Sequence, residues 1–235
     1  SSPCTSPSPD LSSNFKPFSP LDLLYQAQTA MKLKQLITTT AAAAAALPLS
    51  SLAHVGADGG GHHHFLDSLS HAFAHPFTGA DHLAAMLAVG AWSALTMPSL
   101  RTAWRAPAAF VALLVAGALA GFAGLWVPGV EPMIAASVLV LGLLVLVQKK
   151  MPWGVAAALA GVFAFFHGAA HGFELAGDSG MATVGALAGI ALGSATLHVA
   201  GMVFGHAVMQ RHRWLAQFGG AATAALGAFM LTRLA

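Results

Sequence analysis

Residues 75–82, with the sequence HPFTGADH, open a long apolar run, residues 83–97, that carries no charged side chain. A second polar cluster, HGAAHGFE at residues 167–174, closes another apolar run. An ionisable group inside such a segment is costly to bury, so imidazoles and carboxylates there indicate a functional role. The apolar runs therefore decide the fold, and the two clusters are the candidates for its chemistry.

The composition excludes an ordinary soluble domain. The chain has 235 residues, of which 57% are hydrophobic and 8% are charged. In soluble domains, about a quarter of all residues are charged. The apolar segments are long and unbroken instead of alternating, which favours membrane helices over a barrel. We therefore expect an all-α, polytopic membrane helix bundle whose main partner is the lipid bilayer. A net charge of only +2 suggests no nucleic-acid partner.

Histidine is the prominent metal-ligating residue of this chain. Twelve histidines outnumber eight acidic residues, and Cys4 is the single cysteine. A cysteine-based metal site or an internal disulfide is therefore excluded. Imidazole suits the borderline metals nickel, cobalt, copper and zinc.

The first 53 residues resemble a targeting region more than part of the bundle. Residues 1–30 are rich in Ser and Pro and predict a disordered upstream extension. Residues 31–53 have the plan of a cleaved signal peptide: Lys32 and Lys34, an alanine-rich core, and the small-x-small site Ser51-Leu52-Ala53. The alternative is an uncleaved, weak membrane anchor.

Residues 54–74 predict an extracytoplasmic tail with a short interfacial helix. The spacing of Phe65, Leu66, Leu69 and Phe73 places them on one helix face, which could lie along the membrane surface. Four histidines before this helix are candidates for metal capture, or simply part of a flexible glycine-rich linker. They are His54, His62, His63 and His64.

Residues 75–235 predict a transmembrane domain with six spans, in which Pro76, Pro132 and Pro152 stand at helix starts. A row of small residues, Gly185, Gly189 and Gly193, predicts close helix packing in lipid. The expected spans are 76–97, 106–127, 132–147, 152–174, 181–209 and 214–234.

Basic residues predict the orientation. Lys and Arg occur in the connections after the first, third and fifth spans and are absent from the other two connections between spans. The positive-inside rule then puts these three loops in the cytoplasm and both termini outside a bacterial inner membrane. With this orientation, the first span begins and the fourth span ends on the outer side, so both polar clusters lie at the same depth.

Helical spacing turns the clusters into a candidate metal site. His167, His171 and Glu174 share one helix face, and so do His75 and His82 if their helix is continuous. Asp81 could ligate or could orient a ligating imidazole. Such a set suits nickel or cobalt, and also zinc or copper. The alternative is that these side chains only hydrogen-bond between helices.

The same residues carry a resemblance to a known family. The segment from His75 to His82 resembles the HPxxGxDH signature of the HupE/UreJ nickel/cobalt permeases, and residues 166–174 resemble their FHGxAHGxE signature. The resemblance covers about residues 31–235 and implies uptake of nickel, or cobalt, for enzymes such as hydrogenase and urease. It carries over six functional positions: His75, Asp81, His82, His167, His171 and Glu174.

Two further histidines and two further functions stay open. His198 and His206 in the fifth span could pass an ion inward, or could be structural. The chain contains no nucleotide-binding phosphate loop and no zincin HExxH motif, so we expect a permease, without a prosthetic group, and not an enzyme. The alternatives are an intramembrane metal or haem redox protein and a metal sensor that transports nothing. Because imidazoles bind metal only when neutral, uptake should weaken as the pH falls through about 6.5.

Overall fold

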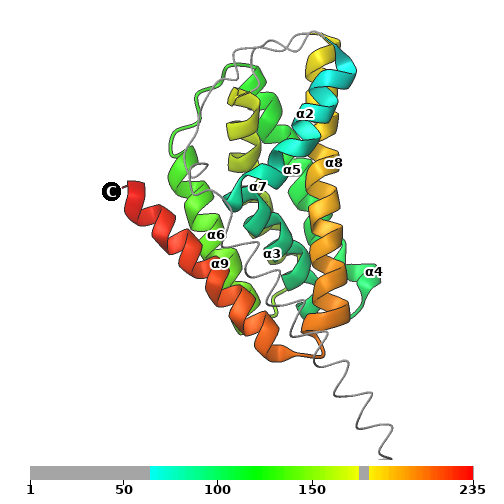
Figure 1. Ribbon diagram of the computed structural model, residues 1–235, viewed down its shortest axis with the longest axis vertical. Helices are drawn as coiled ribbons and strands as arrows, with labels where there is room; N and C mark the ends of the chain where they lie inside the picture. Colours follow the sequence, from blue (N-terminus) through cyan, green and yellow to red (C-terminus); the bar gives the residue numbers. More distant parts are fainter. Residues whose placement is uncertain (1–63, 175–179, 235) are drawn as a thin grey trace, which may run out of the picture. The chain divides into compact units, whose positions relative to one another are not determined.

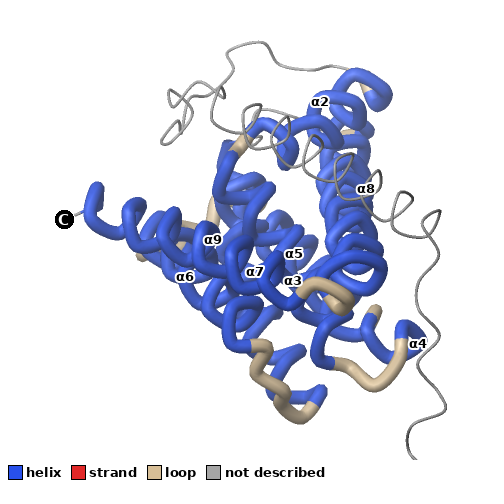
Figure 2. Tube along the Cα trace, turned by 60° about the horizontal axis from the view of Figure 1, so that its bottom comes forward, coloured by secondary structure: helices blue, strands red, loops and turns tan. Residues whose placement is uncertain are grey.

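The computed structural model describes residues 64–174 and 180–234, and every regular element in them is a helix (Figures 1 and 2). The predicted extension and signal peptide, together with His54, His62 and His63, lie outside the described residues. The all-α prediction is confirmed. The elements are α2 (Phe65–Thr78), α3 (Ala80–Thr96), α4 (Leu100–Ala103), α5 (Arg105–Phe122), α6 (Val130–Val147), α7 (Trp153–Glu174), α8 (Met181–Phe204), the π-helical η2 (Gly205–Met209) and α9 (Arg213–Leu234).

Five helical segments within the described ranges are long and apolar enough to cross a membrane, so the protein is a multi-pass membrane protein. They are Leu100–Phe122, Val130–Val147, Trp153–Glu174, Met181–Met209 and Arg213–Leu234, and they match the second to sixth predicted spans. The first predicted span is divided between α2 and α3. Because α3 has 17 residues, at the short end of what a bilayer needs, the count of six spans stays a prediction.

The helix break at Gly79 differs from the expected continuous span. Gly79 has extended backbone angles and is both the C-cap of α2 and the N-cap of α3. Its carbonyl accepts a hydrogen bond from the Leu83 N–H in the first turn of α3. The expected helix start at Pro76 is wrong, because α2 begins at Phe65 and Pro76 lies in its last turn. A proline there removes one backbone donor, and the glycine that follows does not favour a helix, so the chain can turn between them.

Small residues hold the bundle together by letting backbones touch. α2 and then α3 run beside α8 in the same direction (Figure 1), with Gly185 against the Phe65 carbonyl and Gly201 against the Leu87 carbonyl. A methyl group at either glycine would overlap that carbonyl oxygen. Gly185, Gly189 and Gly193 all face α2, so the predicted glycine row is a helix-packing surface.

Many large apolar side chains face outward, as a lipid environment allows. On α2, Leu66 is 71% exposed, whereas the small residues Ser68 and Ala72 are buried against the bundle. Lipid tails are as apolar as leucine, so burying a large side chain inside the protein gains little over leaving it in lipid. The predicted apolar face of this helix exists, but whether it lies along the membrane surface stays a prediction.

The three basic connections gather at one end of α3. The Trp92 Nε1–H donates to the Lys149 carbonyl at 3.0 Å, Ser93 donates to the Ala103 carbonyl, and Gln210 donates to the Ala94 carbonyl at 2.8 Å. These bonds tie the α3–α5, α6–α7 and η2–α9 connections to the same end of the bundle, which is what the positive-inside prediction requires. The orientation itself stays a prediction; following it, we call this the inner end and the end at Gly79 the outer end.

Candidate metal centre

Five of the six predicted site residues meet at the outer end, where the α2–α3 break lies against the end of α7. His75 comes from the last turn of α2, His82 from the first turn of α3, and His171 from the last turn of α7. His167 and Glu174 stand one turn on either side of His171 on the same face of α7. Residues about 90 positions apart in the chain therefore share one site.

The glycines that directly follow the two α7 histidines explain why the imidazoles point where they do. A methyl group at Gly168 or Gly172 would overlap the Leu114 or Ala118 carbonyl of α5. These two glycines therefore press α7 onto α5. His167 and His171, each one residue earlier, are turned about 100° away from that contact and towards α2 and α3.

Glu174 connects two of the imidazoles at the outer rim of the site. Its Oε2 lies 3.1 Å from His75 Nε2 and 3.7 Å from His171 Nδ1. The side chains of His75 and Glu174 are 27% and 15% exposed, whereas His171 is fully buried. The site therefore opens at His75 and Glu174 and closes at His171.

His82 lies against both α7 histidines. Its ring centroid is 4.4 Å from that of His171 and 5.0 Å from that of His167. One nitrogen from each of His75, His82 and His171 can be chosen so that all three lie within 4.8 Å of one another. Metal–nitrogen bonds are about 2 Å long, so a single cation between three such nitrogens is within reach of small side-chain movements.

The buried imidazole nitrogens are left open for a ligand. His167 Nδ1 lies 3.0 Å from the Phe163 carbonyl, which can only accept, so Nδ1 carries the hydrogen and Nε2 keeps its lone pair. Within the described part of the chain, this Nε2, His82 Nδ1 and His171 Nε2 have no hydrogen-bond partner. A buried nitrogen without a partner is costly in an apolar interior, and a bound cation would remove that cost.

Asp81 has a different position from the other five. Its Oδ1 accepts a hydrogen bond from the backbone N–H of His82 at 2.8 Å, at the positive end of α3. A methyl group at Gly79 would lie 2.8 Å from this oxygen and 3.1 Å from the His82 ring. The glycine therefore leaves room for the carboxylate and the imidazole to fold back over the break.

The remaining predicted histidines divide into one buried side chain and two exposed ones. His198 is 1% exposed, and its Nδ1–H donates to the Met86 carbonyl at 2.8 Å, which leaves Nε2 without a partner among the described residues. His206 and His64 are exposed, on η2 and at the start of α2. The structure brings neither of these two to the buried site.

Sequence reasoning missed two neighbours of the site. Phe110 of α5 is fully buried and contacts both His167 and His198, with ring centroids 5.9 Å and 4.8 Å away. No sequence signal distinguishes it from other apolar residues of its helix. His71 lies one turn before His75, with ring centroids 6.3 Å apart, and its spacing of four residues was the available signal.

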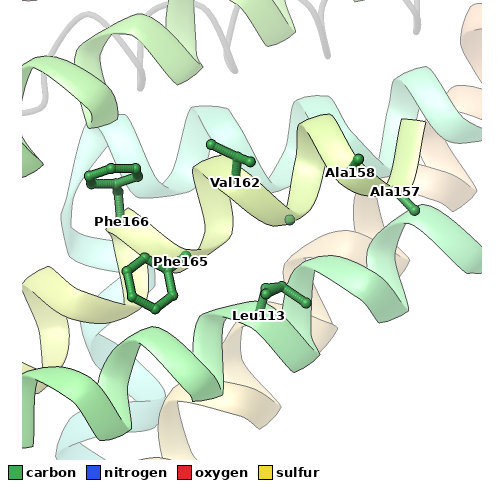
Figure 3. A pocket seen from close by; sticks show the side chains of 7 residues that line it. Leu113, Ala157, Ala158, Val162, Phe165 and Phe166 are labelled. Atoms are coloured by element: carbon green, nitrogen blue, oxygen red, sulfur yellow. The ribbon is translucent and has the colours of Figure 1, made fainter. Parts of the chain in front are cut away.

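An apolar groove between α5 and α7 is separate from this site (Figure 3). It is lined by Leu113, Gly161 and Val162, with alanine and phenylalanine side chains around them. None of these residues offers a side-chain ligand for a cation. The groove therefore belongs to the apolar surface of the bundle and not to the candidate metal centre.

Comparison with known proteins agrees with the signatures in α2, α3 and α7. The sequence model of the family described as HupE / UreJ protein matches residues 41–230. Protein HupE of Rhizobium leguminosarum bv. viciae is 39% identical over 172 residues, which cover 73% of this chain and 83% of that relative. No solved structure matches the chain. The match to most of the chain, together with both signatures, shows that this protein belongs to the HupE/UreJ family.

Proposed function

We propose that this protein is a permease that carries a divalent transition metal ion, nickel or cobalt, across the membrane through the candidate metal centre at its outer end. The observation that carries the proposal is the convergence of His75, His82 and His171 from three helices, with one nitrogen of each within 4.8 Å of the others. Family membership and the imidazole-rich donor set favour a borderline metal.

The charges near the site suit a doubly charged cargo. With neutral imidazoles, the two carboxylates among the predicted site residues, Asp81 and Glu174, supply two negative charges. A divalent cation would neutralise both, which lowers the cost of holding it among apolar helices. Glu174 at the open rim is the natural first carboxylate to meet the ion, and the buried imidazoles would then replace its water.

His198 would be the next ligand towards the inner end. Its Nε2 is buried and open, and Phe110 lies in contact with both its ring and that of His167. An ion leaving His167 would therefore pass the Phe110 ring. The exposure of His206 weighs against a role for it in this interior path.

The membrane potential supplies enough energy for uptake. A doubly charged ion gains about 4.6 kcal/mol from a potential of 100 mV, inside negative, at about 2.3 kcal/mol per charge. This corresponds to accumulation on the order of a thousandfold, so no second coupled ion is required energetically.

Uptake of radioactive nickel by cells that express the protein tests the proposal. His171→Ala removes a fully buried ligand and should abolish uptake above the level of cells without the protein. His212→Ala, the same substitution at an exposed loop position, is the matched control and should leave uptake unchanged. Both variants are compared at equal amounts in the membrane fraction. Full uptake by His171→Ala would contradict the proposal, and a visible absorption band of haem in the purified protein would favour the redox alternative.

A further inference from the structure

The α2 helix has three distinct faces, and the metal centre described so far uses only His75 from one of them. At about 100° per residue, Ser68, Ala72 and Pro76 form the face buried against α8. Leu66, Phe73 and Phe77 form the exposed apolar face. The third face, within about 80° of arc, carries Asp67, His71 and His75.

This third face leads from the surface to the metal centre. Asp67 is exposed, His71 is partly buried, and the His75 side chain is 27% exposed. The next imidazoles, His82 and His171, are 6% and 0% exposed. On α2, ligand-type side chains therefore recur every four residues, and they lead from the exposed Asp67 through the partly buried His71 and His75 to the buried His82 and His171.

His75 lies between two groups of imidazoles. Its ring centroid is 6.3 Å from that of His71 on one side, and 6.2 Å and 4.9 Å from those of His82 and His171 on the other. Two histidines four residues apart on a helix present their nitrogens on the same side, an arrangement that chelates divalent metals in other helical sites. His75 can therefore belong to an outer pair with His71 or to a more deeply buried set with His82 and His171. We call the latter the inner set, although it too lies at the outer end of the bundle.

We propose that His71, with Asp67 beside it, forms an outer entry site for the divalent cation, from which His75 transfers the ion to the buried imidazoles. This inference rests on the proposed transport function and extends its path outward. The entry site holds the ion with fewer protein ligands than the inner set, so its binding is weaker and its exchange with the surroundings is faster. Transfer proceeds by ligand exchange at His75, so the ion is held by at least one imidazole throughout.

Nickel binding to the purified, full-length protein tests this inference separately from transport. The parent for the test carries His171→Ala, which disables the inner set, and Gln in place of His54, His62, His63 and His64, which removes the other upstream histidines. Isothermal titration with nickel should show one weak residual site in this parent. Adding His71→Asn, which keeps a polar side chain of similar size, should weaken that site by about tenfold or more. Adding Ser70→Ala, a neighbouring exposed position outside the third face, should leave it unchanged.

The weak nickel binding that remains in the parent variant decides whether His71 forms an entry site. A parent without a weak site, or a weak site that survives His71→Asn, would overturn the inference. In otherwise unchanged protein, His71→Asn should raise the nickel concentration for half-maximal uptake by about tenfold and leave the maximal rate within about twofold. A loss of maximal rate alone would indicate a structural role instead. Weak-site binding lost with His71→Asn, combined with no nickel uptake by the natural protein, would contradict the proposed transport function and leave the entry site standing.

Discussion

The two ends of α3 differ in whether their buried polar side chains are hydrogen-bonded. At the inner end, Trp92, Ser93 and Thr96 are buried, and each donates a hydrogen bond to a backbone carbonyl. At the outer end, His82 is equally buried, yet its Nδ1 has no hydrogen-bond partner among the described residues. A paired polar group stabilises the bundle, whereas an unpaired one costs free energy, and a bound ligand would remove that cost. Under the proposed function, the inner end serves stability and the outer end serves binding.

Removing the imidazole at the outer end should have the largest effect on transport. His82→Ala deletes a ligand that lies against both His167 and His171, so nickel uptake should fall by about 100-fold or more. The thermal midpoint of the purified protein without metal should stay close to that of the natural protein, because an unpaired polar group is lost. A variant that unfolds early while retaining uptake per folded molecule would reverse the assignment of the two ends.

Filling the space at the α2–α3 break should have an intermediate effect. Gly79→Ala places a methyl group 2.8 Å from Asp81 Oδ1 and 3.1 Å from the His82 ring, so both side chains must shift. The backbone angles at Gly79 are open to alanine, and the fold should therefore persist. We expect uptake to fall by about tenfold, as for other losses of ligand orientation, with the protein still present in the membrane fraction. Gly154→Ala, where a methyl group meets no atom within 4 Å, is the matched control.

Breaking one hydrogen bond at the inner end should affect stability alone. Trp92→Phe removes the donor to the Lys149 carbonyl and should lower the free energy of unfolding by about 1–3 kcal/mol. Thermal unfolding in detergent measures this loss, and nickel uptake per folded molecule should stay within about twofold of the natural protein. Loss of uptake without loss of stability would show that the inner connections take part in transport.

Much of the fold could be predicted because lipid imposes simple rules. Segments such as residues 130–147 and 213–234 carry enough consecutive apolar residues to be recognised one at a time. The packing role of the glycine row of α8 could also be predicted, because close approach of helices in lipid requires small residues. The break at Gly79 was not predicted, because Pro76 and Gly79 permit a turn without requiring one, and the turn depends on how α2 and α3 both pack on α8.

The sequence alone determined which residue types are available to bind a cation and which helices carry them, because helical spacing fixes the face that His167, His171 and Glu174 share. Only the tertiary structure decided that His75 and His82 meet these residues across a broken helix, that Asp81 turns to the backbone of α3, and that Phe110 and His71 adjoin the site. The physical reason is that contacts between helices depend on how their small-residue surfaces dock, and spacing along a single helix carries no information about the neighbour on which it will pack.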